Sequence, residues 1–234
     1  GKPALDILPK LKKNSLTVLE LSSFQLQDLY KSPDIAVITN ITLDHLDPGK
    51  KFAPATHQTP KEYFNAKMNI IRYQGTKDFA VLHPSLKPKT KDIGTGRKIF
   101  PEARLLETRL KGPHNLENIA LALAVGKILG VPKKKVFKAI KNFRGIEHRL
   151  EFVKRINGTS FYNDSAATNP DAVLAALKSF KEPVHLILGG FDKGLDYKNL
   201  TQYISKTKNI RSVMLIGQLK NKLYKLLKKC GRRK

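Results

Sequence analysis

Short apolar runs alternate with helical patterns along this chain. Runs of mainly apolar residues at 16–21, 34–39 and 79–82 lead into polar residues or a helix rather than into a tight hairpin turn. Helices are expected at about 60–72, 115–129 and 133–142. Strands that alternate with helices predict an α/β fold built on a parallel, doubly wound sheet.

The same alternation starts again after Gly145. Strands are expected at 152–155, 159–162, 184–188 and 212–217, and helices at 170–180 and 218–230. We therefore place a boundary there and predict two domains, residues 1–145 and 146–234. The second is expected to be a partial α/β sheet, because the pattern stops where another strand is due.

The formal net charge is +25, from 44 Lys and Arg against 19 Asp and Glu. Strongly basic chains often bind nucleic acids. However, 34 of the cations are lysines, and only 10 are the arginines that grip bases and phosphates with two hydrogen bonds. We expect no specific nucleic-acid partner, although a basic, non-catalytic nucleic-acid-binding module stays as an alternative. Anionic substrates fit the charge equally well.

The single cysteine, Cys230, excludes an internal disulfide framework and a cysteine metal cluster. No run of about 18 apolar residues predicts a membrane span, and the first residues do not have the apolar core of a signal peptide. These features predict a soluble cytoplasmic protein, which we expect to be a monomer.

Asn-Asp-Ser-Ala-Ala-Thr-Asn at 163–169 places polar groups at a predicted strand-to-helix junction. Asn169 can cap the helix, Pro170 suits its first turn, and Asp171 complements the positive end of its dipole. Helix N-termini bind phosphates and carboxylates well, and Glu-His-Arg at 147–149 comes shortly before this stretch. Taken alone, the pattern also fits an ordinary capped turn.

A second polar group follows two predicted strands. Glu20 lies at the end of the first, and Asp44, His45 and Asp47 follow the second. Ligands collect beyond the carboxyl ends of the strands in such sheets, so these groups are expected at one rim. They suit a divalent ion, with Mg²⁺ favoured where phosphate is bound. Alone, Glu20 also fits a solvated strand end and His45 a surface histidine.

Lys67 lies on the helix predicted at 60–72, on the same face as Phe64. Its stem could pass over the core toward this rim. It could equally be a surface lysine whose stem covers apolar neighbours.

Seven short motifs follow one another along essentially the whole chain. They are Leu-Glu-Leu-Ser-Ser-Phe-Gln-Leu at 19–26, Thr-Asn-Ile-Thr-Leu-Asp-His-Leu-Asp at 39–47, Phe-Asn-Ala-Lys at 64–67, Gly-Pro-His-Asn-Leu-Glu-Asn at 112–118, His-Arg at 148–149, Asn-Asp-Ser at 163–165 and Gly-Gly-Phe-Asp-Lys at 189–193. In this order they resemble the Mur ligase family, most closely its MurD type. The resemblance implies a central ATPase domain followed by a Rossmann-like C-terminal domain.

The resemblance also implies a reaction of peptidoglycan precursor synthesis. The carboxylate of UDP-N-acetylmuramoyl-L-alanine attacks the γ-phosphate of ATP, and the amine of D-glutamate then displaces phosphate from the resulting acyl phosphate. Magnesium and cationic side chains must neutralise the transferring phosphoryl group while the reactants are held in line.

Carried over by position, the resemblance implies four groups of site residues. Glu20, His45 and Lys67 match the Mg²⁺ site, with His45 and Lys67 also matched to catalysis. Lys67 matches a lysine that the family carries as a carbamate, an anionic oxygen ligand. The other matches are Ser22 and Gln25 for the UDP-muramoyl substrate, Asn115, Arg149 and Asp164 for ATP, and Ser165, Thr168 and Lys193 for the incoming amino acid.

Two departures from the family pattern matter. The sequence contains no G-x-x-x-x-G-K-[ST] phosphate loop. We therefore expect a fragment that lacks the family's N-terminal domain, phosphate loop and C-terminal end, and that is inactive alone. Ala166 stands where the commoner MurD pattern has lysine, which removes a charge-assisted contact typically worth about 1.5–3 kcal/mol. Another Mur or folylpolyglutamate-type ligase with a different amino-acid substrate stays as an alternative.

Overall fold

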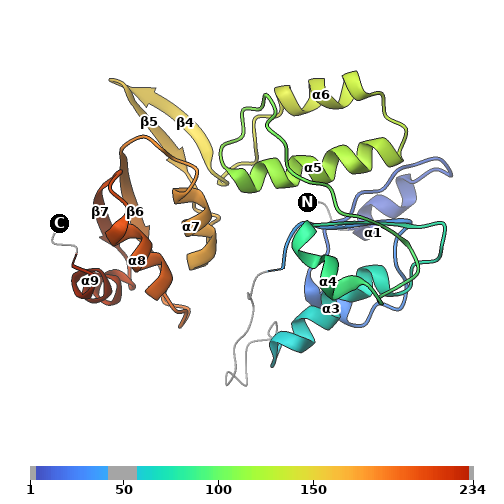
Figure 1. Ribbon diagram of the computed structural model, residues 1–234, viewed down its shortest axis with the longest axis horizontal. Coiled ribbons are helices and arrows are strands. Elements are labelled where there is room, and N and C mark those ends of the chain that lie inside the picture. The colour runs from blue at the N-terminus through green and yellow to red at the C-terminus, as the bar shows by residue number, and fades with distance from the viewer. Residues whose placement is uncertain (1–3, 42–56, 232–234) are drawn as a thin grey trace. The chain divides into compact units, whose positions relative to one another are not determined.

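The computed structural model describes residues 4–41 and 57–231. The chain divides into two compact units, residues 1–100 and 101–234. Both units contain parallel strands together with helices (Figure 1), which confirms the predicted α/β class. Units defined by packing need not coincide with family domains, so the boundary expected after residue 145 stays a prediction.

The first unit holds a parallel sheet in the order β1-β2-β3. Its strands are β1 (Ile35–Ile38), β2 (Phe79–Leu82) and β3 (Arg97–Ile99). Helix α3 (Pro60–Arg72) buries Met68 and Ile71 in a core shared with Ala36 and Leu82 of the strands. The shorter elements are α1 (Ala4–Ile7), η1 (Leu8–Lys10), α2 (Ser23–Gln27), η2 (Pro84–Leu86) and α4 (Lys87–Thr90).

The strand predicted at 16–21 is wrong. This segment pairs with no strand in the described part of the chain, and Leu16, Val18 and Leu19 expose 66%, 87% and 54% of their surface. An extended segment becomes a strand only when a neighbouring strand takes up its backbone hydrogen bonds. Within the described sheet, β1 pairs with β2 alone, so its other edge takes up none of these bonds.

The second unit begins with α5 (Pro113–Ile128) and α6 (Lys133–Asn142), two helices that lie side by side (Figure 1). An antiparallel hairpin of β4 (Glu151–Ile156) and β5 (Thr159–Asn163) follows. Asn157 and Gly158 form its turn with φ of 47° and 80°, the positive values that a tight two-residue hairpin turn requires.

The rest of the second unit is built around the parallel pair β6 (Val184–Gly189) and β7 (Ile210–Ile216). Three helices pack with this pair in one core: α7 (Pro170–Leu177), α8 (Lys198–Lys206) and α9 (Lys220–Lys229). Leu188 of β6, Ile204 of α8 and Leu223 of α9 are buried there. This core supports the turns that carry the candidate site.

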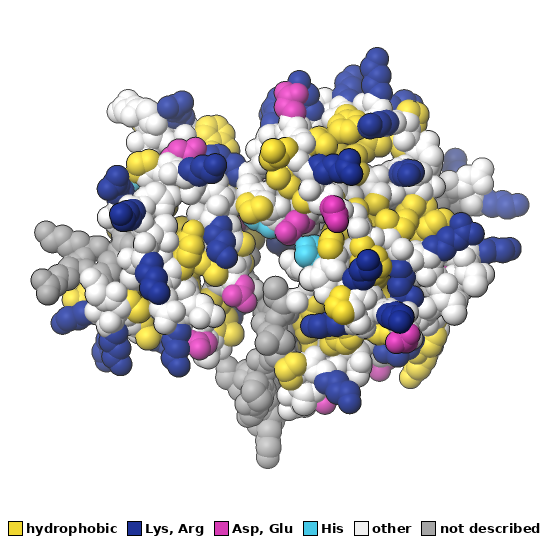
Figure 2. All heavy atoms as spheres, viewed as in Figure 1, with side chains coloured by type: hydrophobic (Ala, Val, Ile, Leu, Met, Phe, Trp, Pro, Cys, Tyr) yellow, Lys and Arg dark blue, Asp and Glu magenta, His cyan; other side chains and the backbone are white. Residues whose placement is uncertain are grey.

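Lysine and arginine side chains are spread over the whole face shown in Figure 2 and do not gather in one stripe. This spread is typical of a solvated surface and does not favour the nucleic-acid-binding alternative. Among the described residues, no helix has the length and apolar character needed to cross a membrane.

Candidate functional site

Two turns of the second unit are joined by hydrogen bonds. The N–H of Leu150 donates to Oδ1 of Asp164 at 2.9 Å, and the N–H of Ala166 donates to the carbonyl oxygen of His148 at 3.0 Å. The amide of Asn163 also lies 2.8 Å from Nδ1 of His148. The structure therefore brings together the segments 146–150 and 163–169, which contain the Glu-His-Arg at 147–149 and the polar stretch that the sequence singled out as candidate chemistry.

The first of these turns has a strained backbone. His148 and Leu150 have φ of 63° and 47°, a region that such side chains rarely adopt and that costs on the order of 1–3 kcal/mol per residue. Strain of this size persists only where surrounding contacts enforce it, and the hydrogen bonds from the second turn are such contacts. They hold Arg149, which lies between the two strained residues, at the edge of a cavity.

The cavity has a volume of about 380 Å³ and lies wholly within the second unit. Its aromatic wall is formed by Phe152 and Tyr162, whose rings meet edge to face with centroids 5.5 Å apart. The remaining lining residues are Arg109, Leu110, Lys111, Asn115, Arg144, Gly145, Arg149 and Leu150. An aromatic wall beside several cations suits a ligand that has both a flat ring and a negative charge.

Asn115 lines this cavity in a fixed orientation. Its Nδ2 donates to the carbonyl oxygen of Lys111 at 2.7 Å. Because only the NH₂ group of the amide can donate to a carbonyl, this bond determines which end of the amide is which. Among the described residues, no hydrogen-bond donor to Oδ1 of Asn115 is present, so this oxygen can accept a hydrogen bond from a ligand.

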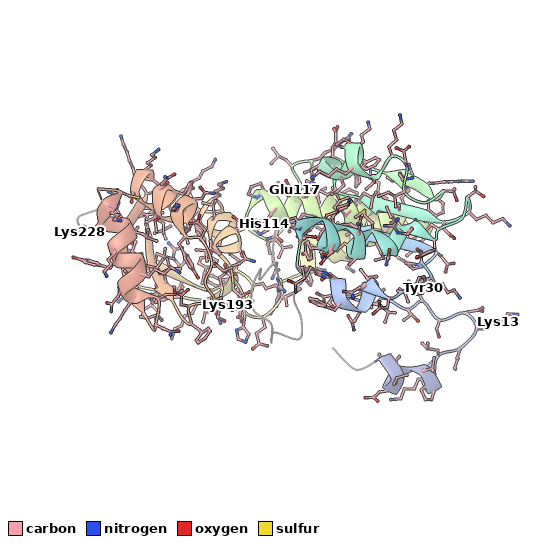
Figure 3. All side chains as sticks on the ribbon, turned by 90° about the horizontal axis from the view of Figure 1, so that it is seen from below. Lys13, Tyr30, His114, Glu117, Lys193 and Lys228 are labelled. Carbon is pink, nitrogen blue, oxygen red and sulfur yellow. The ribbon has the colours of Figure 1, made fainter. Side chains whose placement is uncertain are left out.

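Asp164 and His114 of α5 interact electrostatically. Burial raises the pKa of Asp164, and the Leu150 hydrogen bond and the charges of His114 and Arg149 oppose that shift. Burial lowers the pKa of His114, against the attraction of Glu117 and Asp164. His114 and Glu117 both project from the first turns of α5 (Figure 3). Burial is the largest cause of both pKa shifts, so this corner is partly shielded from water.

The lowered pKa of His114 predicts a pH-dependent stability. The unfolded chain takes up a proton near the ordinary histidine pKa of about 6.5, whereas folded His114 does so only at lower pH. Stability is therefore retained above that value and lost as the pH falls through the window below it. Urea unfolding at a series of pH values should show a smaller loss for His114→Gln.

His185 offers a matched control for this prediction, because it is an exposed histidine on β6. His185→Gln removes a histidine that lies outside the corner formed by His114 and Asp164. The raised pKa of Asp164 has the opposite effect on stability, which it lowers as the pH rises above the ordinary pKa of an aspartate. The contribution of His114 is therefore read from the difference between the two variants. Equal curves for both variants would contradict the effect.

The loop after β6 is tied to α9. Both carboxylate oxygens of Asp192 lie 3.1 Å from Nζ of Lys222, and Oδ1 also accepts the N–H of Gly194 at 2.9 Å. At Gly189, where φ is 156°, a Cβ atom would come within 1.9 Å of the carbonyl oxygen of Ile216, so only glycine allows β6 and β7 to end this close together. Lys193 lies on the surface of this fixed loop (Figure 3).

The turn at 163–169 also starts α7 as the sequence predicted. Oδ1 of Asn169 accepts the N–H of Ala172 at 2.8 Å, and Pro170 occupies the first turn. Ser165 and Thr168 are exposed, and Ala166 is half-buried between them. The helix cap and the bonds to the neighbouring turn coexist, so the capping interpretation does not exclude a binding role.

In the first unit, Ser22 and Gln25 form a capping box at the start of α2. Oγ of Ser22 accepts the N–H of Gln25 at 3.3 Å, and Oε1 of Gln25 accepts the N–H of Ser22 at 2.9 Å. This is the arrangement that Ser-x-x-Gln predicts at a helix start. It gives both residues a structural role, and their proposed contact with the UDP-muramoyl substrate stays a prediction.

Lys67 of α3 lies half-buried beside an aromatic cluster. Its Nζ is 5.0 Å from the ring centroid of Tyr63. His57 stacks on Phe24 of α2 with centroids 4.5 Å apart and meets Tyr63 edge to face at 5.4 Å. The cluster links α2, which carries Gln25, to the helix that carries Lys67. Nothing in the sequence had singled out His57, although its place shortly before the 60–72 helix was visible.

The expected Mg²⁺ ligands can be followed only in part. Glu20 is exposed in the segment 15–22, and His45, with Asp44 and Asp47, lies outside the described residues. Within residues 4–41 and 57–231, no group of three or more His, Cys, Asp and Glu could hold a metal ion. The carboxylate of Glu20 and the imidazole of His45 are suitable donors in kind, so the site stays a prediction.

Two family models match this chain. Residues 5–99 match the Mur ligase middle domain, and residues 148–232 match the Mur ligase glutamate ligase domain. The chain therefore belongs to the Mur ligase family. Both matches include segments discussed above: the first covers Glu20, Ser22 and Lys67, and the second covers residues 148–150 of the first joined turn and the whole of the turn at 163–169.

Individual relatives agree with this assignment. The chain is 36% identical to the UDP-N-acetylmuramoylalanine–D-glutamate ligase of Bacillus cereus (strain AH187), over 99% of this chain and 55% of that protein. Among solved structures, MurF from Acinetobacter baumannii has a TM-score of 0.63 at 17% identity, over 88% of this chain and 51% of that one. MurF from Thermotoga maritima in complex with ADP has a TM-score of 0.56 at 15% identity, over 87% and 64%. The chain spans about half the length of the curated relatives it matches.

Proposed function

We propose that this chain carries the nucleotide- and amino-acid-binding part of a cytoplasmic, ATP-dependent ligase that joins D-glutamate to UDP-N-acetylmuramoyl-L-alanine. The observation that carries the proposal is the pair of joined turns in the second unit. Three polar contacts link them, place Arg149 at the cavity and hold Asp164 against the neighbouring turn. These are two of the three residues that match the ATP contacts of the family.

The cavity has suitable chemistry for an adenine nucleotide. The aromatic wall of Phe152 and Tyr162 can receive the base, and the fixed Oδ1 of Asn115 can accept a hydrogen bond from its amino group. Guanine carries a carbonyl oxygen in place of the amino group of adenine, and Oδ1 of Asn115 would repel that oxygen. Arg149 suits spread phosphate charge, and a carboxylate such as Asp164 suits paired ribose hydroxyls.

The proposed reaction has two steps. A carboxylate oxygen of UDP-N-acetylmuramoyl-L-alanine bonds to the γ-phosphorus of ATP, and ADP leaves. The D-glutamate nitrogen then bonds to the carbonyl carbon, loses a proton, and expels phosphate. Lys193, held at the surface by the loop that Asp192 anchors, is the proposed cation for the incoming amino acid.

Magnesium would neutralise the transferring phosphoryl group, and Glu20, His45 and Lys67 are its proposed ligands. Lys67 would bind it as a carbamate. Its Nζ lies 5.0 Å from the centroid of the Tyr63 ring.

A different amino-acid substrate is the second candidate, and Ala166 is the observation that favours it. The side chain that would add a cation to the amino-acid site is a methyl group here. A folylpolyglutamate-type or other Mur-type ligase would use the same nucleotide site with another acceptor and amino acid.

The 234-residue chain alone should bind ADP but release no phosphate from ATP above background, because its sequence has no phosphate loop. Calorimetry measures the binding, and a phosphate-release assay with both substrates and Mg²⁺ measures turnover. Turnover by the chain alone would contradict the expected inactivity.

The ligase activity itself is tested in the complete gene product. ATP-dependent formation of the D-glutamyl amide, detected by mass spectrometry, is the expected result. Omission of each substrate in turn is the control. Amide formation only with a folate acceptor, or only with another amino acid, would favour the second candidate. No ATP-dependent amide with any acceptor would overturn the proposal.

A further inference from the structure

Arginine is concentrated at the cavity of the second unit. Three of the ten arginines in the sequence, Arg109, Arg144 and Arg149, line it, whereas lysine dominates the charge elsewhere. Arg109 precedes α5, Arg144 follows α6, and Arg149 belongs to the strained turn, so three separate segments bring them to one place. Of the three arginines, only Arg149 matches a residue that the family resemblance assigns to ATP binding.

Arg149 acts electrostatically on Asp164, whereas other described carboxylates of this unit have partners other than Arg109 and Arg144. Glu107 pairs with Lys141 at 2.8 Å, and Glu182 pairs with Lys111 at 3.6 Å. Glu151 accepts the N–H of His148 and lies 3.7 Å from its ring. Among the described residues, Arg109 and Arg144 form no ion pair within 4.0 Å.

The two aromatic residues of the cavity lining, Phe152 and Tyr162, belong to a larger ring cluster. Tyr162 is held between Phe152 and Phe180, at centroid distances of 5.5 and 5.0 Å. Nζ of Lys111 lies 5.3 Å from the Tyr162 centroid and 4.9 Å from that of Phe180. Lys111 is thus engaged with rings and with Glu182, which leaves Arg109 and Arg144 as the cavity cations without an ion-pair partner in the part of the chain that the structure describes.

We propose that Arg109 and Arg144 are additional nucleotide-binding residues that contact the phosphate groups of the nucleotide. The proposal rests on the proposed function, because it assumes that the base lies against Phe152 and Tyr162. A guanidinium group binds phosphate through two parallel hydrogen bonds, and unpaired arginines pay no penalty for breaking an existing ion pair. These two residues supply phosphate contacts from the second unit.

The test compares three probes by calorimetry: adenosine, ADP and inorganic triphosphate. Arg109→Gln and Arg144→Gln should each weaken ADP binding by about 10-fold and leave adenosine binding unchanged. The ADP affinity of Arg109→Lys should lie between those of the original chain and Arg109→Gln, because lysine keeps the charge but cannot donate two parallel hydrogen bonds. Arg104→Gln, which removes an exposed arginine outside the cavity, is the matched control and should bind all probes as before.

The outcomes separate this proposal from the function on which it rests. If the unsubstituted chain binds adenosine and ADP equally, the nucleotide site stands and the phosphate role falls. An equal loss of adenosine and ADP binding in the glutamine variants would indicate a structural role and overturn the proposal. Triphosphate binding as tight as ADP binding would support the arginines and contradict the role of the aromatic wall. Binding of neither adenosine nor ADP would contradict both proposals.

Discussion

Asp164→Ala is expected to weaken ADP binding by about 100-fold at neutral pH. Two effects combine. The substitution removes a carboxylate that is proposed to hold the ribose hydroxyls, a charged contact worth about 1.5–3 kcal/mol. It also removes the acceptor of the Leu150 N–H, whose bond at 2.9 Å helps to hold the strained turn in place. Arg149 is then free to leave the cavity edge.

Asp164→Asn separates the two effects. Asparagine keeps an acceptor for the Leu150 N–H but loses the negative charge. We expect a loss of about 10-fold in ADP binding, with the turn intact. Asp171→Asn is the control, because this carboxylate lies in the first turn of α7 and does not line the cavity. Calorimetry measures binding, and thermal unfolding confirms that each variant is folded. A folded Asp164→Ala chain that binds ADP within 3-fold of the original would contradict the proposed contact of Asp164 with the ribose.

Regular elements with apolar periodicity could be predicted from the sequence. The predicted helices at 60–72 and 133–142 and the strand at 79–82 have the bounds observed for α3, α6 and β2. In α3, Thr59 caps the helix and Pro60 follows it, so local chemistry and core packing agree. Agreement of this kind is what makes an element readable from sequence.

Elements without such agreement were missed. Helix α8 begins after Tyr197 without a side-chain cap, although Leu200 and Ile204 have the spacing of a buried helix face. Strand β3 has only three residues, two of them basic, so it has no apolar signal. The segment 16–21 shows the converse case: its apolar pattern is strong, but strand formation depends on a partner strand that local sequence does not encode.

The candidate site divides in the same way. The two turns could be recognised from their residue types, because the cap of α7 and the His-Arg pair are local features. The aromatic wall and the additional arginines could not, because Arg109, Arg144 and Tyr162 come from separate segments that meet only in the folded unit. These residue types are common in any sequence, and they indicate a binding site only because the fold brings them close together.

Ala166→Lys should lower the Michaelis constant for D-glutamate by about 10- to 100-fold in the complete gene product. The half-buried Ala166 lies in the turn that carries Ser165 and Thr168, and its backbone N–H donates to the carbonyl oxygen of His148. The substitution leaves that backbone bond in place and adds a cation beside the proposed amino-acid site. One charge-assisted contact to the substrate carboxylate is worth about 1.5–3 kcal/mol, which sets the expected range.

Ala167→Lys is a matched control, because it adds the same charge at the next residue of the same turn. The N–H of Ala167 is also bonded within the turn, to the carbonyl oxygen of Asp164 at 2.9 Å. A general effect of added positive charge would lower the constant in both variants, whereas a positioned contact acts only from residue 166. If Ala166→Lys leaves the constant unchanged, residue 166 does not face the amino acid. If it impairs use of an uncharged amino acid that the original protein prefers, the alanine is a specificity device, because a cation without a carboxylate partner is then left in the site.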